Sequence, residues 1–357
     1  MKPHFVVALM AMAQGASAEP PRVVTDIAPV HSLVSQVMGD LGDPVLLVDG
    51  AADPHSFQLR PSQTRVLANS DLLIWIGPEF TPWLERAADG ASFAGVSLAL
   101  TGIEPSAHDT MASHKTEHNE EHANEDHEHH DEHEAEGHDE HEHHDEHESD
   151  EHHDEHTDHD EEEHHDEHAA DDHESEGHGE DHHHAHGADI HAWLDPVVAQ
   201  TWLVEIAEHL SEADPENAAV YGSNALSAQL RIDDLTLNVQ SQLDKANVGP
   251  ILVYHDAYAP FADRFEVEVA GALRKEDHSA PSAAHLRELQ ETIETTGVEC
   301  VFLEPQQDSG LMDSIIGDQA VGRGVLDPTG ATLLPGPHLY DALILGLAVS
   351  IATCKDS

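Results

Sequence analysis

One segment limits how this chain can fold. Residues 106–188 consist mainly of His, Asp and Glu, contain almost no apolar side chains, and hold 26 of the chain's 35 histidines. Such a segment buries too little apolar surface to offset the entropy of ordering it, so we expect it to be disordered without metal. The core must therefore come from two separate stretches, 19–105 and 189–357, with residues 106–188 as a long surface insertion between them.

The composition of the insertion indicates metal binding. Its histidines alternate with carboxylates, as around His130 and His152. Imidazole suits zinc, copper, nickel and iron better than magnesium or calcium, and the neighbouring acids attract divalent cations. The alternative is a solvated acidic tract with no specific role. The net charge of -58 excludes nucleic acid and anionic lipid as partners bound through a general basic field.

The N-terminus carries the three parts of a cleavable signal peptide. Lys2 is positive, residues 5–13 are apolar, and residues 16–18 are the small residues of a cleavage site. Cleavage after Ala18 would release a soluble protein into the periplasm, because no other stretch is long and apolar enough to span a bilayer. The alternative is a frayed N-terminal helix.

The chain has two cysteines, Cys300 and Cys354. Disulfides persist in oxidising compartments such as the periplasm, and a bridge here would join the last helix to a buried strand. The sequence leaves open two unpaired buried thiols, since it does not fix the geometry that bonding requires.

Apolar runs alternate with helical patterns in both stretches. The expected strands are 23–27, 44–48, 72–76, 95–100, 251–254, 268–272, 298–303 and 324–326. The expected helices are 30–38, 62–68 with Ser62 as its cap, 197–210, 215–246, 260–265, 282–296, 311–320 and 339–352. This alternation predicts an α/β fold with two lobes and largely parallel sheets.

These patterns divide the chain into six parts. They are a signal peptide (1–18), an N-terminal lobe (19–105), the insertion (106–188), the end of the N-terminal lobe (189–212), a connecting helix (213–248) and a C-terminal lobe (249–357).

Four possible metal ligands lie at strand ends or loops. His55 follows the second strand, His255 and Asp327 follow strands of the second lobe, and His191 comes just after the insertion. Ligands of open α/β sheets bind beyond the carboxyl ends of strands, so these side chains could meet in the cleft between the lobes. Three nitrogens and one oxygen suit tetrahedral zinc. Each histidine taken alone also fits a surface or core role.

The stretches around these residues resemble a known family. Residues 54–62, 189–196, 254–258, 302–306 and 326–328 are similar to the metal-binding substrate-binding proteins of ABC transporters, most closely the zinc-uptake type, ZnuA. The acidic, His-rich insertion between the first two stretches is characteristic of the zinc members. The resemblance covers essentially the whole mature chain.

The resemblance implies a fold and a ligand set. It implies two pseudo-symmetric α/β lobes joined by a long helix, with limited closure, and a Cys300–Cys354 disulfide. It implies that His55, His191 and His255 bind zinc, with water, a carboxylate from residues 49–53, or Asp327 in the fourth position. Arg60, Asp195 and Asp256 could orient the histidines; the alternative is that they cap helices or pair with each other.

We therefore expect a monomeric periplasmic protein that delivers zinc to the membrane permease of an ABC importer. In this hypothesis the insertion collects zinc weakly and passes it to the interlobe site. One alternative is a zinc buffer or chaperone without a transporter. Another is a manganese- or iron-binding member of the same family, although such members generally have a carboxylate where His255 stands. An enzyme is not expected, because the chain has no His-Glu-x-x-His helix and no clear general base beside the ligands.

Overall fold

Two parallel four-stranded sheets form the framework of the computed structural model, which describes residues 19–50, 52–105, 189–275, 280–305 and 307–356. The predicted signal peptide (1–18) and insertion (106–188) lie outside the described residues. The first sheet has the order β2-β1-β3-β4, with strands Val45–Leu46, Val23–Thr25, Leu72–Trp75 and Val96–Ala99. The second has the order β6-β5-β7-β8, with strands Val269–Arg274, Ile251–His255, Cys300–Leu303 and Gly322–Val325. Both sheets share one strand order, and the expected pair of parallel α/β lobes is confirmed.

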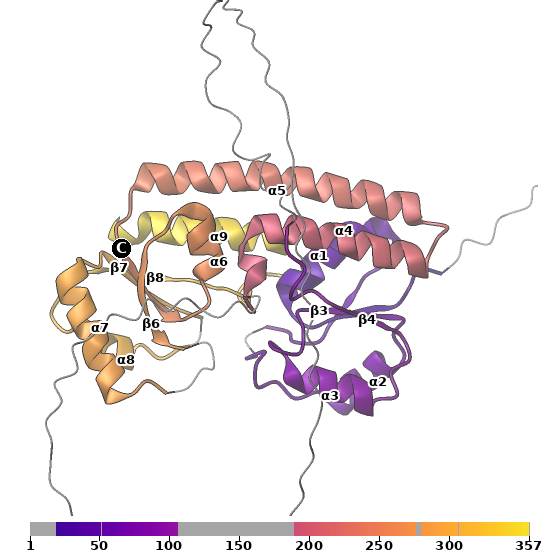
Figure 1. Ribbon diagram of the computed structural model, residues 1–357, viewed down its shortest axis with the longest axis horizontal. Helices are drawn as coiled ribbons and strands as arrows, with labels where there is room; N and C mark the ends of the chain where they lie inside the picture. Colours follow the sequence, from indigo (N-terminus) through magenta and orange to yellow (C-terminus); the bar gives the residue numbers. More distant parts are fainter. Residues whose placement is uncertain (1–18, 51, 106–188, 276–279, 306, 357) are drawn as a thin grey trace, which may run out of the picture. The chain divides into compact units, whose positions relative to one another are not determined.

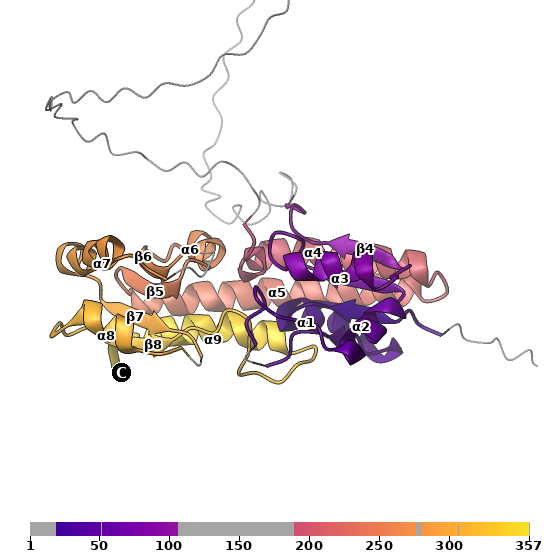
Figure 2. The ribbon, with the colours of Figure 1, turned by 90° about the horizontal axis from the view of Figure 1, so that it is seen from below.

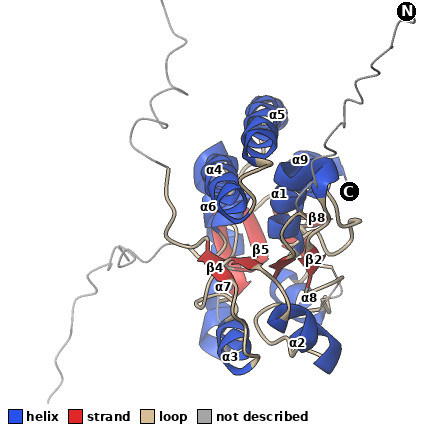
Figure 3. Cartoon of the chain, turned by 90° about the vertical axis from the view of Figure 1, so that its right-hand side faces the viewer, coloured by secondary structure: helices blue, strands red, loops and turns tan. Residues whose placement is uncertain are grey.

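Helices cover both faces of each sheet (Figure 3). The layer common to the two sheets contains α1 (Ala28–Met38), α4 (Pro196–Ala213), α5 (Ala218–Ala246), α6 (Ala259–Phe265) and α9 (Leu339–Thr353). The opposite face carries α2 (Pro61–Ala68) and α3 (Pro82–Gly90) on the first sheet, and α7 (Ala283–Thr296) and α8 (Gly310–Ile316) on the second. Within the described residues, none of these helices combines the length and apolarity needed to cross a membrane.

The alternation of side chains along each strand builds these layers. In β3, Ile74 points into the common core while Leu73 and Trp75 pack toward α2 and α3. In β5, Val253 joins the common core and Leu252 packs toward α7 and α8. Because one continuous core serves both sheets, the two lobes share their largest apolar layer.

Helix α5 runs along both lobes in this common layer (Figures 1 and 2). Its 29 residues span about 44 Å at 1.5 Å per residue. It begins later than the predicted connecting helix (213–248), because the chain turns between α4 and α5. There Asp214 is buried and accepts hydrogen bonds from the Tyr221 hydroxyl and the Asn217 side chain.

A disulfide joins Cys300, the first residue of β7, to Cys354 just beyond α9, with their Cα atoms 6.1 Å apart. Both residues lie in the common core. The bond ties the end of α9 to the centre of the second sheet and closes a long loop, which restricts the unfolded chain.

In the first sheet, a buried side chain fills the crevice where the strand order reverses. At this point, between the ends of β1 and β3, the buried Asp26 carboxylate accepts the backbone N–H of Ile27 at 2.8 Å and that of Ile76 at 2.9 Å. Burial raises the pKa of Asp26 to about 7, although both hydrogen bonds act to lower it. The place that usually binds a ligand in an open α/β sheet is thus filled by a carboxylate of the chain itself.

This carboxyl predicts a pH-dependent stability. The folded chain binds the Asp26 proton more tightly than the unfolded chain, whose Asp titrates near 3.9. The stabilisation is therefore complete below about pH 4 and is lost as the pH rises through about 7, by up to about 4 kcal/mol. Urea unfolding of the metal-free protein between pH 4.5 and 8 should show this slope. It should be absent in Asp26→Asn, which cannot titrate; parallel pH profiles for the two proteins would contradict the assignment.

Candidate metal site

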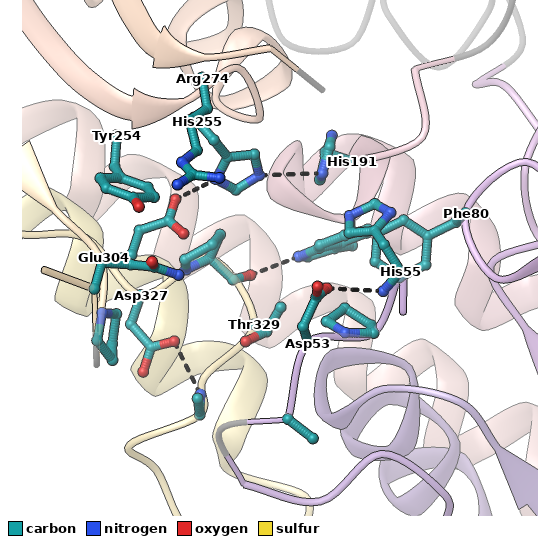
Figure 4. A pocket seen from close by; sticks show the side chains of 17 residues that line it. Asp53, His55, Phe80, His191, Tyr254, His255, Arg274, Glu304, Asp327 and Thr329 are labelled. Atoms are coloured by element: carbon teal, nitrogen blue, oxygen red, sulfur yellow. Dashed lines mark hydrogen bonds and ion pairs between the residues drawn. The ribbon is translucent and has the colours of Figure 1, made fainter. Parts of the chain in front are cut away.

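A pocket of about 330 Å³ lies between the two lobes, at the carboxyl ends of the strands. Its walls carry all four ligand candidates from the sequence, together with two further carboxylates (Figure 4). The lining histidines and acids are His55, His191, His255, Asp53, Glu304 and Asp327.

Two of the histidines already face each other. The Nε2 atoms of His191 and His255 are 3.5 Å apart, and both residues are buried, at 2% and 4% exposure. Two nitrogens bound to one tetrahedral zinc at about 2.0–2.1 Å would lie roughly 3.3–3.4 Å apart. The pair therefore has nearly the separation that a shared zinc ion requires.

Glu304 fixes the orientation of the His255 ring. Its carboxylate accepts a hydrogen bond from His255 Nδ1 and a second one, at 3.0 Å, from the hydroxyl of Tyr258. With the proton on Nδ1, the Nε2 lone pair faces the pocket, which is the tautomer that a metal ligand needs. Burial and the charge of Glu304 raise the pKa of Tyr258 well above its usual value, so its hydroxyl stays a donor.

The turn that carries His191 is held from several sides. Tyr340 of α9 donates its hydroxyl to the Trp193 carbonyl at 2.8 Å, and the Trp193 indole N–H donates to the Pro328 carbonyl at 2.8 Å. Arg264 of α6 binds both oxygens of Asp195, each at 2.8 Å. These contacts tie the turn to elements of the second half of the chain, which also carries His255.

His55 lies in the loop between β2 and α2, where the indole N–H of Trp83 donates to the neighbouring Pro54 carbonyl at 2.6 Å. The Asp53 carboxylate accepts the His55 backbone N–H at 2.9 Å and the Ser56 hydroxyl at 2.8 Å. The His55 ring packs edge-on against Phe80 with 4.5 Å between centroids, and its centroid is 5.9 Å from that of His191. Accordingly, the described residues contain no group of three or more His, Cys, Asp or Glu side chains already arranged to hold a metal ion.

Asp327 lines the pocket, but its carboxylate organises its own loop. One oxygen accepts the N–H of Ala331 at 2.9 Å, and the other accepts the N–H and hydroxyl of Thr332 at 2.8 and 2.7 Å. As a metal ligand it would have to share or give up these bonds.

Three residues were expected to orient the histidines, and the contacts of Asp195 and Arg60 lie mainly with helix ends and an ion pair. Asp195 caps α4 by accepting the Val197 N–H and pairs with Arg264, while Asp256 is exposed. Arg60 precedes α2 and donates its backbone N–H to the side chain of that helix's third residue. The residue that orients His255 is Glu304, which sequence reasoning missed. It directly follows β7, the neighbour of β5, so the strand-end argument that selected His255 could have found it.

The chain is similar in sequence to known zinc-uptake proteins. The sequence matches the family described as zinc-uptake complex component A, periplasmic (ZnuA), over residues 23–354. It is 42% identical, over 98% of this chain and 96% of the relative, to the high-affinity zinc uptake system protein ZnuA of Paracoccus denitrificans.

Solved structures share the fold. A zinc-bound deletion mutant of ZnuA superimposes with a TM-score of 0.63 at 21% identity, covering 94% of this chain and 98% of that chain. The substrate-binding protein FpvC of Pseudomonas aeruginosa, in complex with Mn²⁺, gives 0.65 at 16% identity, with 94% and 98% covered. Because one of these proteins holds zinc and the other manganese, the fold does not select the metal.

The bond between Tyr340 and Trp193 can be tested with an isosteric change. Tyr340→Phe leaves the buried Trp193 carbonyl without its donor, which should lower the free energy of unfolding by about 1–3 kcal/mol. Since this bond supports the His191 turn, zinc affinity should also fall, by roughly tenfold or less. Chemical unfolding and competitive zinc titration measure the two effects.

Tyr221→Phe is the matched control. Tyr221 is equally buried and donates its hydroxyl to Asp214 at 2.9 Å, in the turn between α4 and α5. This variant should lose stability without losing zinc affinity. Equal zinc affinities for the two variants would show that the Tyr340 bond does not support the site.

Proposed function

The chain belongs to the ZnuA family of periplasmic zinc-uptake components, and we propose that it captures zinc between its lobes and delivers it to the permease of an ABC-type importer. The observation that supports this most is the pair of buried histidines, whose Nε2 atoms lie 3.5 Å apart with Glu304 behind His255. This arrangement offers two oriented nitrogen ligands before any ion arrives.

We propose that His55 completes the ligand set. It lines the same pocket, and a modest movement of the loop between β2 and α2 would bring its ring from Phe80 toward His191. Three imidazoles suit zinc, whereas manganese favours oxygen-rich sites. This ligand chemistry supports zinc over the manganese or iron alternative.

Transport fits the site better than hydrolysis does. A zinc hydrolase needs a base beside the metal-bound water, on the open side of the ligands. Glu304 instead holds His255 through Nδ1, on the side of the ring away from Nε2. The family is one of solute-binding proteins, in agreement with this argument.

The remaining parts of the proposal follow from the sequence. Residues 1–18 act as a cleaved export signal, residues 106–188 collect zinc weakly, and the protein docks on its permease as a monomer. Because a metal-binding imidazole must be unprotonated, zinc binding should weaken as the pH falls and should be stronger at neutral pH.

Removal of single ligands tests the site. In protein lacking residues 108–186, we expect one tight zinc ion. Zinc affinity should fall roughly a hundredfold or more in each of His55→Ala, His191→Ala and His255→Ala, because each change removes one of the few bonds that hold the ion. Competitive titration with a chromophoric chelator measures both stoichiometry and affinity.

The opposite result would favour another function. If the shortened protein has no tight site, the insertion is the main zinc binder and the buffer hypothesis takes first place. If only His191→Ala and His255→Ala weaken binding, His55 is not a ligand.

The hydrogen bond between Glu304 and His255 Nδ1 can be tested separately. Glu304→Gln keeps the shape of the side chain and an oxygen that can accept from Nδ1 and Tyr258, but it removes the negative charge that strengthens the Nδ1 bond and makes Nε2 a better metal ligand. Zinc affinity should fall about 10–100-fold, as for other partners behind metal-binding histidines. The measurement is zinc affinity of the full chain, with His255→Ala as the reference for binding elsewhere.

Glu299→Gln provides the control. Glu299 lies just before β7, at the opposite end of the strand, and binds Lys355 at 2.6 Å. Its replacement should leave zinc affinity unchanged. Equal losses in both variants would mean that the Glu304 effect is a general one on the sheet.

A further inference from the structure

We propose that the pocket takes zinc together with a small carboxylate, which supplies the fourth ligand and is held by Arg274. This inference rests on the proposed function of the site, and it concerns what arrives with the ion. The guanidinium of Arg274 lines this pocket, although the other polar side chains there suit a divalent cation.

The position of Arg274 is set by the second sheet. It is the last residue of β6 and pairs in register with His255, the last residue of the neighbouring strand β5. Its guanidinium carbon lies 5.6 Å from the ring centroid of Tyr254, which also lines the pocket. Figure 4 shows Arg274 beside His255, on the same wall. A guanidinium has five N–H donors, so it can keep contacts within the protein and still bind a ligand.

The acids of the pocket are already engaged in holding protein groups. Asp53 accepts bonds within the His55 loop, Glu304 accepts His255 and Tyr258, and Asp327 accepts three donors of its own loop. Three histidines leave one position of a tetrahedral zinc ion unfilled. A ligand that enters from the pocket can fill it without breaking these bonds.

Charge and size favour a small carboxylate. Zinc and Arg274 repel each other, and an anion bound between them would be attracted to both. A carboxylate also fits a guanidinium geometrically, because it can accept two parallel N–H hydrogen bonds from it. The three acids lining the pocket disfavour a dianion such as phosphate more strongly than a monoanion. The volume of about 330 Å³ far exceeds the roughly 10–15 Å³ that one water requires, so a small organic acid has room.

Cobalt(II) gives a direct readout, because its visible spectrum reports the ligands of a tetrahedral site. The full chain receives one equivalent of cobalt in a sulfonate buffer, and the His255→Ala variant serves as the blank for cobalt bound elsewhere. Acetate is then titrated against sodium perchlorate at equal ionic strength. We expect the wild-type spectrum to shift and saturate with acetate but not with perchlorate.

Variants of Arg274 separate binding from structure. In Arg274→Gln the half-saturating acetate concentration should rise roughly tenfold or more, since a hydrogen bond to a charged group is lost. Arg274→Lys should give a half-saturating acetate concentration between those of wild type and Arg274→Gln, because lysine keeps the charge but cannot donate two parallel hydrogen bonds. Arg287→Gln, which removes the same charge from an exposed position on α7, should behave as wild type. A purely structural role for Arg274 would lower thermal stability and leave the acetate titration unchanged.

The source of the carboxylate is a second arm of the test. Glycine that saturates at a lower concentration than acetate would indicate that zinc arrives as an amino acid chelate, and equal concentrations would indicate a free carboxylate. An unchanged wild-type spectrum, an Arg274→Gln response equal to wild type, or phosphate saturating below acetate would overturn the proposal. The absence of any tetrahedral cobalt signal that His255→Ala removes would instead overturn the proposed function itself.

Discussion

The apolar core shared by the two sheets is the constraint on which the rest of the structure depends. Helices α1, α4, α5 and α9 pack in one layer that serves both lobes, and α5 runs along the two of them without a break. Burying this layer is the largest favourable term available to such a fold, so separating the lobes widely would expose much of it. The pocket between the lobes therefore keeps nearly fixed walls.

The three histidines of the pocket lie on different elements of the fold. His191 and His255 are buried: His255 bonds Glu304, His191 donates its backbone N–H to Asp189, and the turn of His191 is tied to α9 through the Trp193 carbonyl. His55 sits on a loop that is held by its own Asp53 turn, by the Trp83 indole N–H at the Pro54 carbonyl, and by packing of the His55 ring against Phe80. The pocket thus presents a buried pair of histidines, His191 and His255, beside a third histidine on a loop.

The strands and most helices were predictable because their apolar runs are long or periodic. Helix α3 was missed because its apolar face is short: only Leu84 of its nine residues is buried, and Trp83, Ala87 and Ala88 are partly buried beside it. Helix α2 begins at Pro61 instead of being capped by Ser62, because proline suits the first helical position. Strand-end reasoning placed the ligand candidates at one pocket and could have selected Glu304 as well, but the sequence alone could not show that Glu304 bonds His255 or that Trp193 is tied to Tyr340 and Pro328. These bonds join residues far apart in the chain, and they depend on how neighbouring strands and helices are packed.

The two sheets repeat one strand order, yet they treat their equivalent crevices differently. In the first, Asp26 bridges the backbone between β1 and β3; in the second, His255 and Glu304 occupy the same place between β5 and β7. Because Asp26 fills the crevice of the first sheet, only the crevice at His255 and Glu304 contributes side chains to the pocket between the lobes. Two sheets of one topology therefore differ in chemistry at equivalent strand ends, so repetition of the fold does not repeat the site.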